Sequence, residues 1–176
     1  MKIAISGPHG SGKTTIGLDL VSILKKKGIN ATLMPEVARE SPYLIANEQS
    51  PYAQLQIFGA HIDAEMRFAR GVDVLVADRC ILDHVMYMEL FFPQQTGFIE
   101  AMKTFSREYV KTYDFVFKTS KIYESSLTKD NLRPKDSGLQ TSAALKLGTL
   151  LNELCPAHLI LPEEGVIEYI LDRIGY

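Results

Sequence analysis

Residues 7–14 have the types and the spacing that bind a chain of phosphates, because they match the pattern G-x-x-x-x-G-K-[ST]. The glycines let the backbone turn tightly and aim its N–H groups at an anion. Lys13 is expected to reach the β- and γ-phosphates of a nucleoside triphosphate, and the hydroxyl of Thr14 to ligate Mg²⁺. We therefore expect ATP and Mg²⁺ to bind here. The expected nucleotide contacts come from Gly7, His9, Gly10, Ser11, Gly12, Lys13, Thr14 and Thr15.

A carboxylate and a guanidinium end a second apolar run, residues 72–78. Four of the five residues before Asp78 are aliphatic, and Arg79 follows directly. A carboxylate at the end of a buried strand holds Mg²⁺ directly or through water, which makes Asp78 a metal ligand together with Thr14. Arg79 is placed to bind a phosphate oxygen or to neutralise charge in a transition state.

Glu36 and Arg39 follow the apolar residues 31–34. In open α/β sheets ligands bind beyond the carboxyl ends of the strands, so these charges belong to the expected site. Glu36 is expected to accept a hydrogen bond or a proton from an acceptor hydroxyl, and Arg39 to contact a phosphate or balance Glu36. The alternative is a solvated loop with a surface ion pair.

His61 lies on a predicted helix over residues 52–70. Apolar residues recur there at helical spacing and predict a buried stripe formed by Leu55, Phe58, Ile62, Met66 and Ala69. Gln54, His61 and Glu65 share a different face. These three side chains either line an acceptor pocket or face water, and His61 by itself is no metal signal.

Asp83 and Tyr87 are four residues apart on the next predicted helix, residues 81–92. At this spacing they share a face. They either contact the acceptor or form a hydrogen bond on the helix surface.

Residues 119–138 lack the apolar periodicity of their neighbours and are polar and weakly basic, with four cationic residues (Lys121, Lys129, Arg133 and Lys135) against three acidic ones (Glu124, Asp130 and Asp136). This composition is typical of a lid that closes over phosphates and excludes water, with an ordinary flexible loop as the alternative. Arg133 is the best candidate in it for a phosphate contact.

Apolar runs that alternate with helical stretches predict a parallel sheet with helices on both faces. The expected strands cover residues 2–6, 31–34, 72–78, 115–118 and 158–161. A length of 176 residues suits one α/β domain, residues 1–176, that carries the lid.

The overall composition fits a cytoplasmic protein. The apolar fraction is 46% and the net charge is −2, so nucleic acid is possible but not favoured as a partner. No apolar run approaches the roughly 18 residues of a membrane span, and no signal peptide precedes the first strand. Two cysteines are too few for a disulfide framework. We expect a monomer or homodimer.

The chain resembles the small P-loop kinases, in particular the group that includes the ribosylnicotinamide kinase domain of bacterial NAD regulator proteins. The resemblance rests on residues 7–15, 35–40, 78–79, 83–87 and 132–136, in this order. It implies a three-layer P-loop sandwich whose five strands lie in the order 2-3-1-4-5. It also implies that Glu36 positions or deprotonates the acceptor and that Arg79 and Arg133 bind phosphates. With Lys13 and Asp78 these form the expected catalytic set.

Three functions are compatible with these features. The first is an ATP- and Mg²⁺-dependent kinase that phosphorylates a nucleoside or a (deoxy)nucleoside monophosphate, with Glu36, Arg39, His61, Asp83 and Tyr87 at the acceptor. The second is a kinase that acts on a hydroxyl of a modified base or an end in DNA or RNA. The third is an acceptor-free NTPase that works as a switch with a protein partner.

Overall fold

The computed structural model describes residues 1–121 and 137–176. Five parallel strands form one sheet in the order β2-β3-β1-β4-β5, which confirms the order implied by the resemblance. The strands are β1 (Lys2–Ser6), β2 (Ala31–Met34), β3 (Val74–Asp78), β4 (Phe115–Lys118) and β5 (Leu159–Ile160). The α-helices are α1 (Lys13–Lys26), α2 (Pro42–Ile45), α3 (Pro51–Phe68), α4 (Ile81–Phe91), α5 (Thr96–Tyr109), α6 (Ser137–Leu154) and α7 (Val166–Ile174). Two short 3₁₀ helices are η1 (Val37–Glu40) and η2 (Val110–Thr112).

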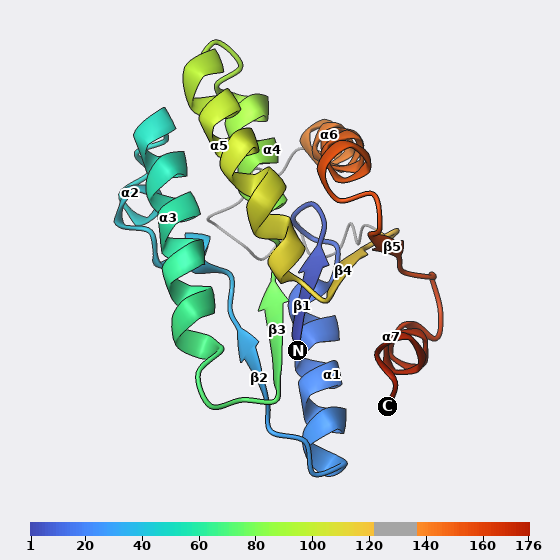
Figure 1. Ribbon diagram of the computed structural model, residues 1–176. Coiled ribbons are helices and arrows are strands. Elements are labelled where there is room, and N and C mark those ends of the chain that lie inside the picture. Colours follow the sequence, from blue (N-terminus) through green and yellow to red (C-terminus); the bar gives the residue numbers. More distant parts are fainter. Residues whose placement is uncertain (122–136) are drawn as a thin grey trace.

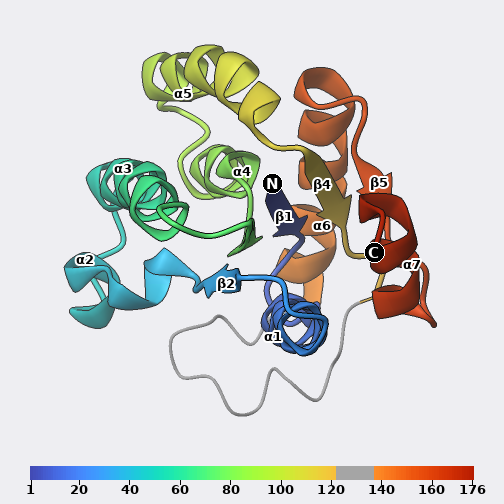
Figure 2. The same cartoon turned by 60° about the horizontal axis from the view of Figure 1, so that its bottom comes forward.

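The alternation of side chains along the strands divides the core into two layers. Ile3 and Ile5 of β1 pack with α1 and α7, whereas Ala4 faces the layer formed by α3, α4, α5 and α6. Figure 2 shows α1 on one side of the strands and α3, α4 and α5 on the other. The strands are therefore covered on both faces, as a parallel sheet requires.

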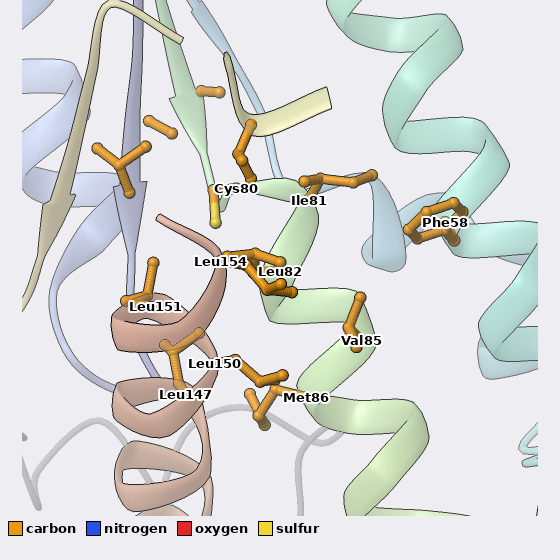
Figure 3. Packing of buried hydrophobic residues seen from close by; sticks show 14 of the residues in the cluster. Phe58, Cys80, Ile81, Leu82, Val85, Met86, Leu147, Leu150, Leu151 and Leu154 are labelled. Atoms are coloured by element: carbon orange, nitrogen blue, oxygen red, sulfur yellow. The ribbon is translucent and has the colours of Figure 1, made fainter. Parts of the chain in front are cut away.

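Helix α4 forms the centre of the larger layer. Ile81, Leu82, Val85 and Met86 are fully buried, and in Figure 3 Leu82 and Met86 face the leucines of α6, whereas Ile81 and Val85 lie on the side of the helix nearer Phe58 of α3. The helix begins directly after β3 and runs on beyond the sheet beside α5 (Figure 1). The helix is apolar on most of its surface and is therefore packed on several sides. This packing holds its first turn, which follows the end of β3, in a fixed position.

The predicted stripe of α3 is confirmed at Phe58, which is buried, and at Leu55 and Ile62, which pack against the core, but it is wrong at Met66 and Ala69, which are exposed. The buried face contains Gln54, His61 and Glu65, whereas Met66 is 60% exposed. His61 and Glu65 therefore do not face water. Polar groups can be buried when they satisfy one another, and distant parts of the chain supply hydrogen bonds to Glu65 and to one ring nitrogen of His61, its Nε2.

Glu65 is the centre of that buried network. Its Oε1 accepts hydrogen bonds from Tyr113 Oη at 2.6 Å and lies 3.0 Å from His61 Nε2, and its Oε2 accepts from Lys2 Nζ at 2.8 Å and Tyr109 Oη at 2.8 Å. Burial by itself would raise the pKa of Glu65, but the hydrogen bonds from His61, Lys2 and Tyr113 outweigh it and lower the pKa from 4.5 to about 2. The network ties α3 to the start of β1 and the end of α5.

We expect Glu65→Gln to lower the free energy of unfolding at pH 7 by about 3 kcal/mol. Since the pKa of Glu65 is lower in the folded chain, this stabilisation is complete above pH 4.5 and is lost as the pH falls towards 2. Urea unfolding at pH 7 and pH 3.5 checks this, because the difference between wild type and variant should shrink at the lower pH. Asp63→Asn, which breaks an exposed ion pair with Arg67 on the same helix, is the control and should change stability by less than about 1 kcal/mol.

No helix in the described parts of the chain is both long enough and apolar enough to span a bilayer. Residues 122–136, which make up most of the expected lid and include Arg133, lie outside the described residues.

Candidate active site

The loop between β1 and α1 is shaped for an anion. Gly10 and Gly12 adopt left-handed backbone angles, with φ of 74° and 79°, which residues with a Cβ rarely adopt. A Cβ on Gly7 would overlap the Thr119 hydroxyl. Helix α1 begins at Lys13 with no side-chain cap and no acidic residue in its first turn. Its first N–H groups and its positive end therefore point at the loop, where they favour an anion.

Lys13 lies folded over this loop. Its ammonium donates to Pro8 O at 2.7 Å and lies 3.5 Å from Ser11 Oγ, and the side chain is buried. Burial first, and then the nearby Arg79, lower the pKa of Lys13 from 10.5 to about 8, although Asp78, Asp83 and Glu36 act in the opposite direction. A buried ammonium bonded mainly to a carbonyl is poorly neutralised, so a phosphate arriving here would gain a strong partner.

This pKa makes nucleotide affinity depend on pH. Below pH 8 Lys13 is already cationic, whereas above it binding requires proton uptake. The dissociation constant for ATP should therefore stay level from pH 7 to pH 7.5 and rise by up to about tenfold per pH unit above pH 8. Calorimetric titration of ATP from pH 7 to 9.5 measures this. Lys13→Arg is the matched control, because a guanidinium stays charged and should remove the rise; a rise that persists in this variant would assign it to another group.

Thr14 and Asp78 meet at the other side of the loop, as expected from the sequence. The Thr14 hydroxyl donates a hydrogen bond to Asp78 Oδ2. Asp78 is 1% exposed, and its Oδ1 has no hydrogen-bond partner among the described residues. An unpartnered buried carboxylate oxygen beside a hydroxyl fits Mg²⁺, which prefers hard oxygen ligands and keeps several waters. No cluster of three or more His, Cys, Asp or Glu side chains suited to a metal occurs in residues 1–121 and 137–176.

Arg79 is buried at the end of β3 and is held from several sides. Its Nε and Nη2 donate to Glu36 Oε1 at 2.7 and 2.6 Å, and its Nη1 donates to Asp83 Oδ1 at 3.2 Å and to Gly7 O at 3.3 Å. Burial would lower the pKa of Arg79, but Glu36, followed by Tyr87 and Asp83, raises it well above its usual value. Its φ of 98° is unusual for a residue other than glycine. Strain of this kind persists only where surrounding contacts impose it, and it concentrates at functional sites.

Asp83 joins the phosphate loop to Arg79. Its Oδ2 accepts from Ser6 Oγ at 2.7 Å and from the Cys80 N–H at 2.9 Å, and its Oδ1 accepts from the Gly7 N–H at 3.1 Å. The side chain is fully buried and does not line the cavity described below. Neither sequence interpretation described this arrangement, in which Asp83 caps the first turn of α4 and positions Gly7 and Arg79.

A cavity opens beside Arg79 and Glu36. We call it the Glu36 cavity, and its volume is about 90 Å³, several times the room that one ordered water needs. It is lined by His9, Glu36, Ala38, Leu44, Gln49, Gln54, Ile57, Arg79, His84, Tyr87, Phe91 and Leu139. One end is charged and the rest is apolar, aromatic or neutral polar, as in sites that take a small organic molecule.

The structure brings three of the five expected acceptor residues to this cavity or its rim. Glu36 and Tyr87 line it, and Tyr87 Oη lies 3.3 Å from His9 Nδ1. Arg39 Nε lies 3.3 Å from Glu36 Oε2 and its side chain is 46% exposed, so it pairs with Glu36, while a phosphate contact stays a prediction. His61 is fully buried in the Glu65 network and does not line the cavity.

His84 is the residue in this wall that the sequence interpretation missed. It lines the Glu36 cavity from α4 and is 2% exposed. Asp83 and Tyr87 were selected because they are four residues apart, and His84, which lies between them, was passed over although it lines the cavity as Tyr87 does.

Comparisons with known proteins give the family and the fold of the chain. A family described as an AAA domain matches residues 2–168. The chain belongs to this AAA-domain family. No curated protein matches it significantly. Among solved structures it is similar to NadR protein in complex with NR, with 18% identity and a TM-score of 0.79 over 99% of this chain and 52% of that one. It is also similar to deoxyadenosine kinase from M. mycoides with dCMP and dCDP bound, with 19% identity and a TM-score of 0.69 over 99% of both chains.

These likenesses establish the P-loop kinase fold for this AAA-domain chain. It spans about half the length of the NadR structure and nearly all of the deoxyadenosine kinase. The resemblance to small P-loop kinases that the sequence suggested is thereby confirmed.

Proposed function

We propose that the chain is an ATP- and Mg²⁺-dependent kinase that transfers the γ-phosphoryl group of ATP to a hydroxyl of an uncharged nucleoside. The observation that carries this proposal is that Arg79 joins the anion loop to the Glu36 cavity: it donates to Gly7 O of the loop, pairs with Glu36, and lines the cavity together with Glu36. A donor phosphate and an acceptor hydroxyl held in these two spaces would meet beside the buried guanidinium.

The residues divide the chemistry between them. The loop amides and Lys13 bind the phosphates, and Thr14 and Asp78 hold Mg²⁺, which when bound neutralises phosphate charge. The acceptor oxygen forms a bond to the γ-phosphorus, the bond from this phosphorus to the β,γ-bridging oxygen breaks, and ADP leaves with the electron pair. Glu36 accepts the hydroxyl proton, and Arg79 stabilises the charge on the transferred group. Arg133 remains the candidate for a further phosphate contact and the lid 119–138 for water exclusion.

The charge of the Glu36 cavity favours a nucleoside over a nucleotide. Among its described lining residues only Arg79 carries a fixed positive charge, and Arg79 is already paired with Glu36 and Asp83. A nucleoside monophosphate would bring roughly two negative charges next to these carboxylates. One structural relative supports the same choice, since it is a deoxyadenosine kinase and deoxyadenosine is an uncharged nucleoside.

Release of ADP in the presence of single nucleosides and of the matching monophosphates tests this proposal. We expect at least one nucleoside to accelerate ADP release by 10²-fold or more over the acceptor-free rate. Acceleration by monophosphates alone would overturn the acceptor class. An equal rate with and without every acceptor would instead support an acceptor-free NTPase.

The setting of this activity follows from its substrates. We propose that the protein works in the cytoplasm, where ATP and nucleosides are available, as a monomer or homodimer of the domain 1–176. We further propose that the base of ATP lies beside Pro162 and Glu163, which with Ser11 and Thr119 line a small groove next to the loop.

A further inference from the structure

Two buried histidines pack edge to face at the wall of the Glu36 cavity, and the proposed phosphoryl transfer uses neither of them. His84 comes from α4 and His61 from α3. Their ring centroids are 4.7 Å apart with an interplanar angle of 62°. Only His84 lines the cavity, and His61 supports it from behind, anchored by Glu65 and Tyr113.

The imidazole of His84 has hydrogen-bonding capacity that the described residues do not use. Its Nε2 is buried and has no hydrogen-bond partner among them. Burial, the neighbouring His61 and Arg79 hold the pKa of His84 well below 6.5, against the opposing effect of Glu36. The ring is therefore neutral and offers one N–H donor and one acceptor nitrogen. A buried polar side chain of this kind is normally satisfied, in many sites by the ligand itself.

The position of His84 along α4 indicates what it meets. Arg79, at the start of this segment, belongs to the charged end of the cavity, where the hydroxyl reacts. His84, Tyr87 and Phe91 follow on the same wall, and the rings of the last two are stacked with centroids 5.7 Å apart. The facing wall on α3 contributes Gln54 and Ile57. A nucleoside has the same division, with a reacting hydroxyl at one end and a planar base with polar edge atoms at the other.

We propose that His84 determines acceptor specificity by forming a hydrogen bond with an edge atom of the acceptor's planar base. This inference rests on the proposed function. In this role His84 selects among acceptor bases and takes no part in the transfer of the phosphoryl group. A buried hydrogen-bonding group discriminates strongly against ligands that leave it unpaired, because no water replaces the missing hydrogen bond.

The test compares His84→Phe and His84→Asn with the wild type on adenosine, guanosine, cytidine, uridine and their deoxy counterparts. His84→Phe keeps a ring but loses both nitrogens, and His84→Asn keeps a donor and an acceptor in another position. We expect the ratio of kcat/KM between the best and the second-best base to change by at least tenfold in His84→Phe, while KM for ATP stays within twofold. His84→Asn should shift the ratio less or towards another base. His158→Phe, at a half-buried histidine beside β5, is the matched control and should leave the ratio unchanged.

The outcomes separate this inference from the proposed function. If the wild type phosphorylates nucleosides but His84→Phe keeps the wild-type ratio, His84 does not read the base. The inference also fails if every nucleoside loses the same factor, since that result describes a structural role. If the wild type phosphorylates no nucleoside, the proposed function fails and this inference fails with it.

Discussion

Replacement of Lys13 by alanine is expected to lower kcat/KM for ATP by at least about 10³-fold. The ammonium lies directly over the anion loop, and the described structure offers it a carbonyl and a hydroxyl but no contact with a carboxylate there. A bound phosphate would therefore be its main charged partner. Because the charge developed in phosphoryl transfer is spread over the phosphate oxygens, loss of this cation should weaken binding and turnover together. Steady-state kinetics together with calorimetric titration of ATP measure both effects.

Lys26→Ala is the matched control for this variant. Lys26 lies in the exposed last turn of the same helix, where it complements the helix dipole. Its replacement should change kcat/KM by less than twofold. If Lys13→Ala binds ATP as tightly as the wild type does, Lys13 does not hold the phosphates.

Glu36→Gln is expected to lower kcat by about 10²-fold or more while the affinity for ATP changes little. The carboxylate lines the cavity and not the loop, so the lost charge lies on the acceptor side. The amide can still accept a hydrogen bond from Arg79, which also keeps Asp83 and Gly7 O as partners. The fold of the site should therefore survive, and the thermal midpoint measured alongside should confirm this.

Glu40→Gln provides the comparison, since Glu40 is exposed in the same short segment. This variant should behave like the wild type. If Glu36→Gln weakens ATP binding and turnover by the same factor, Glu36 belongs to the nucleotide side and the proposed division of the site is wrong.

The phosphate loop and the sheet could be predicted from the sequence because their signals are local. The glycines that need left-handed angles and the lysine and threonine that follow them lie within eight residues. Each strand has its own apolar run. The meeting of Thr14 and Asp78 also followed, because β1 and β3 pair in parallel with Ile5 opposite Asp78.

The wall of the Glu36 cavity could be predicted only in part, because long-range contacts decide it. Apolar periodicity predicted Met66 on the buried face of α3 and Glu65 on a different face. Glu65 is nevertheless buried, because it bonds to Lys2 of β1, to Tyr109 at the end of α5 and to Tyr113 beyond it. Asp83 could not be recognised as a positioning residue, because its contacts with Ser6 and Gly7 span 77 and 76 residues of sequence. His84 could not be selected from the sequence, because a single histidine among mostly apolar residues matches no binding motif.

Transfer of radiolabel from [γ-³²P]ATP tests the central claim most directly, which is that a donor phosphate and an acceptor hydroxyl meet at Arg79 and Glu36. The wild-type protein is incubated with Mg²⁺, labelled ATP and each nucleoside in turn, and the products are separated. We predict label in a nucleoside monophosphate, and its loss in Lys13→Ala and Glu36→Gln. Label that appears only as inorganic phosphate, at a rate that no nucleoside changes, would contradict the account.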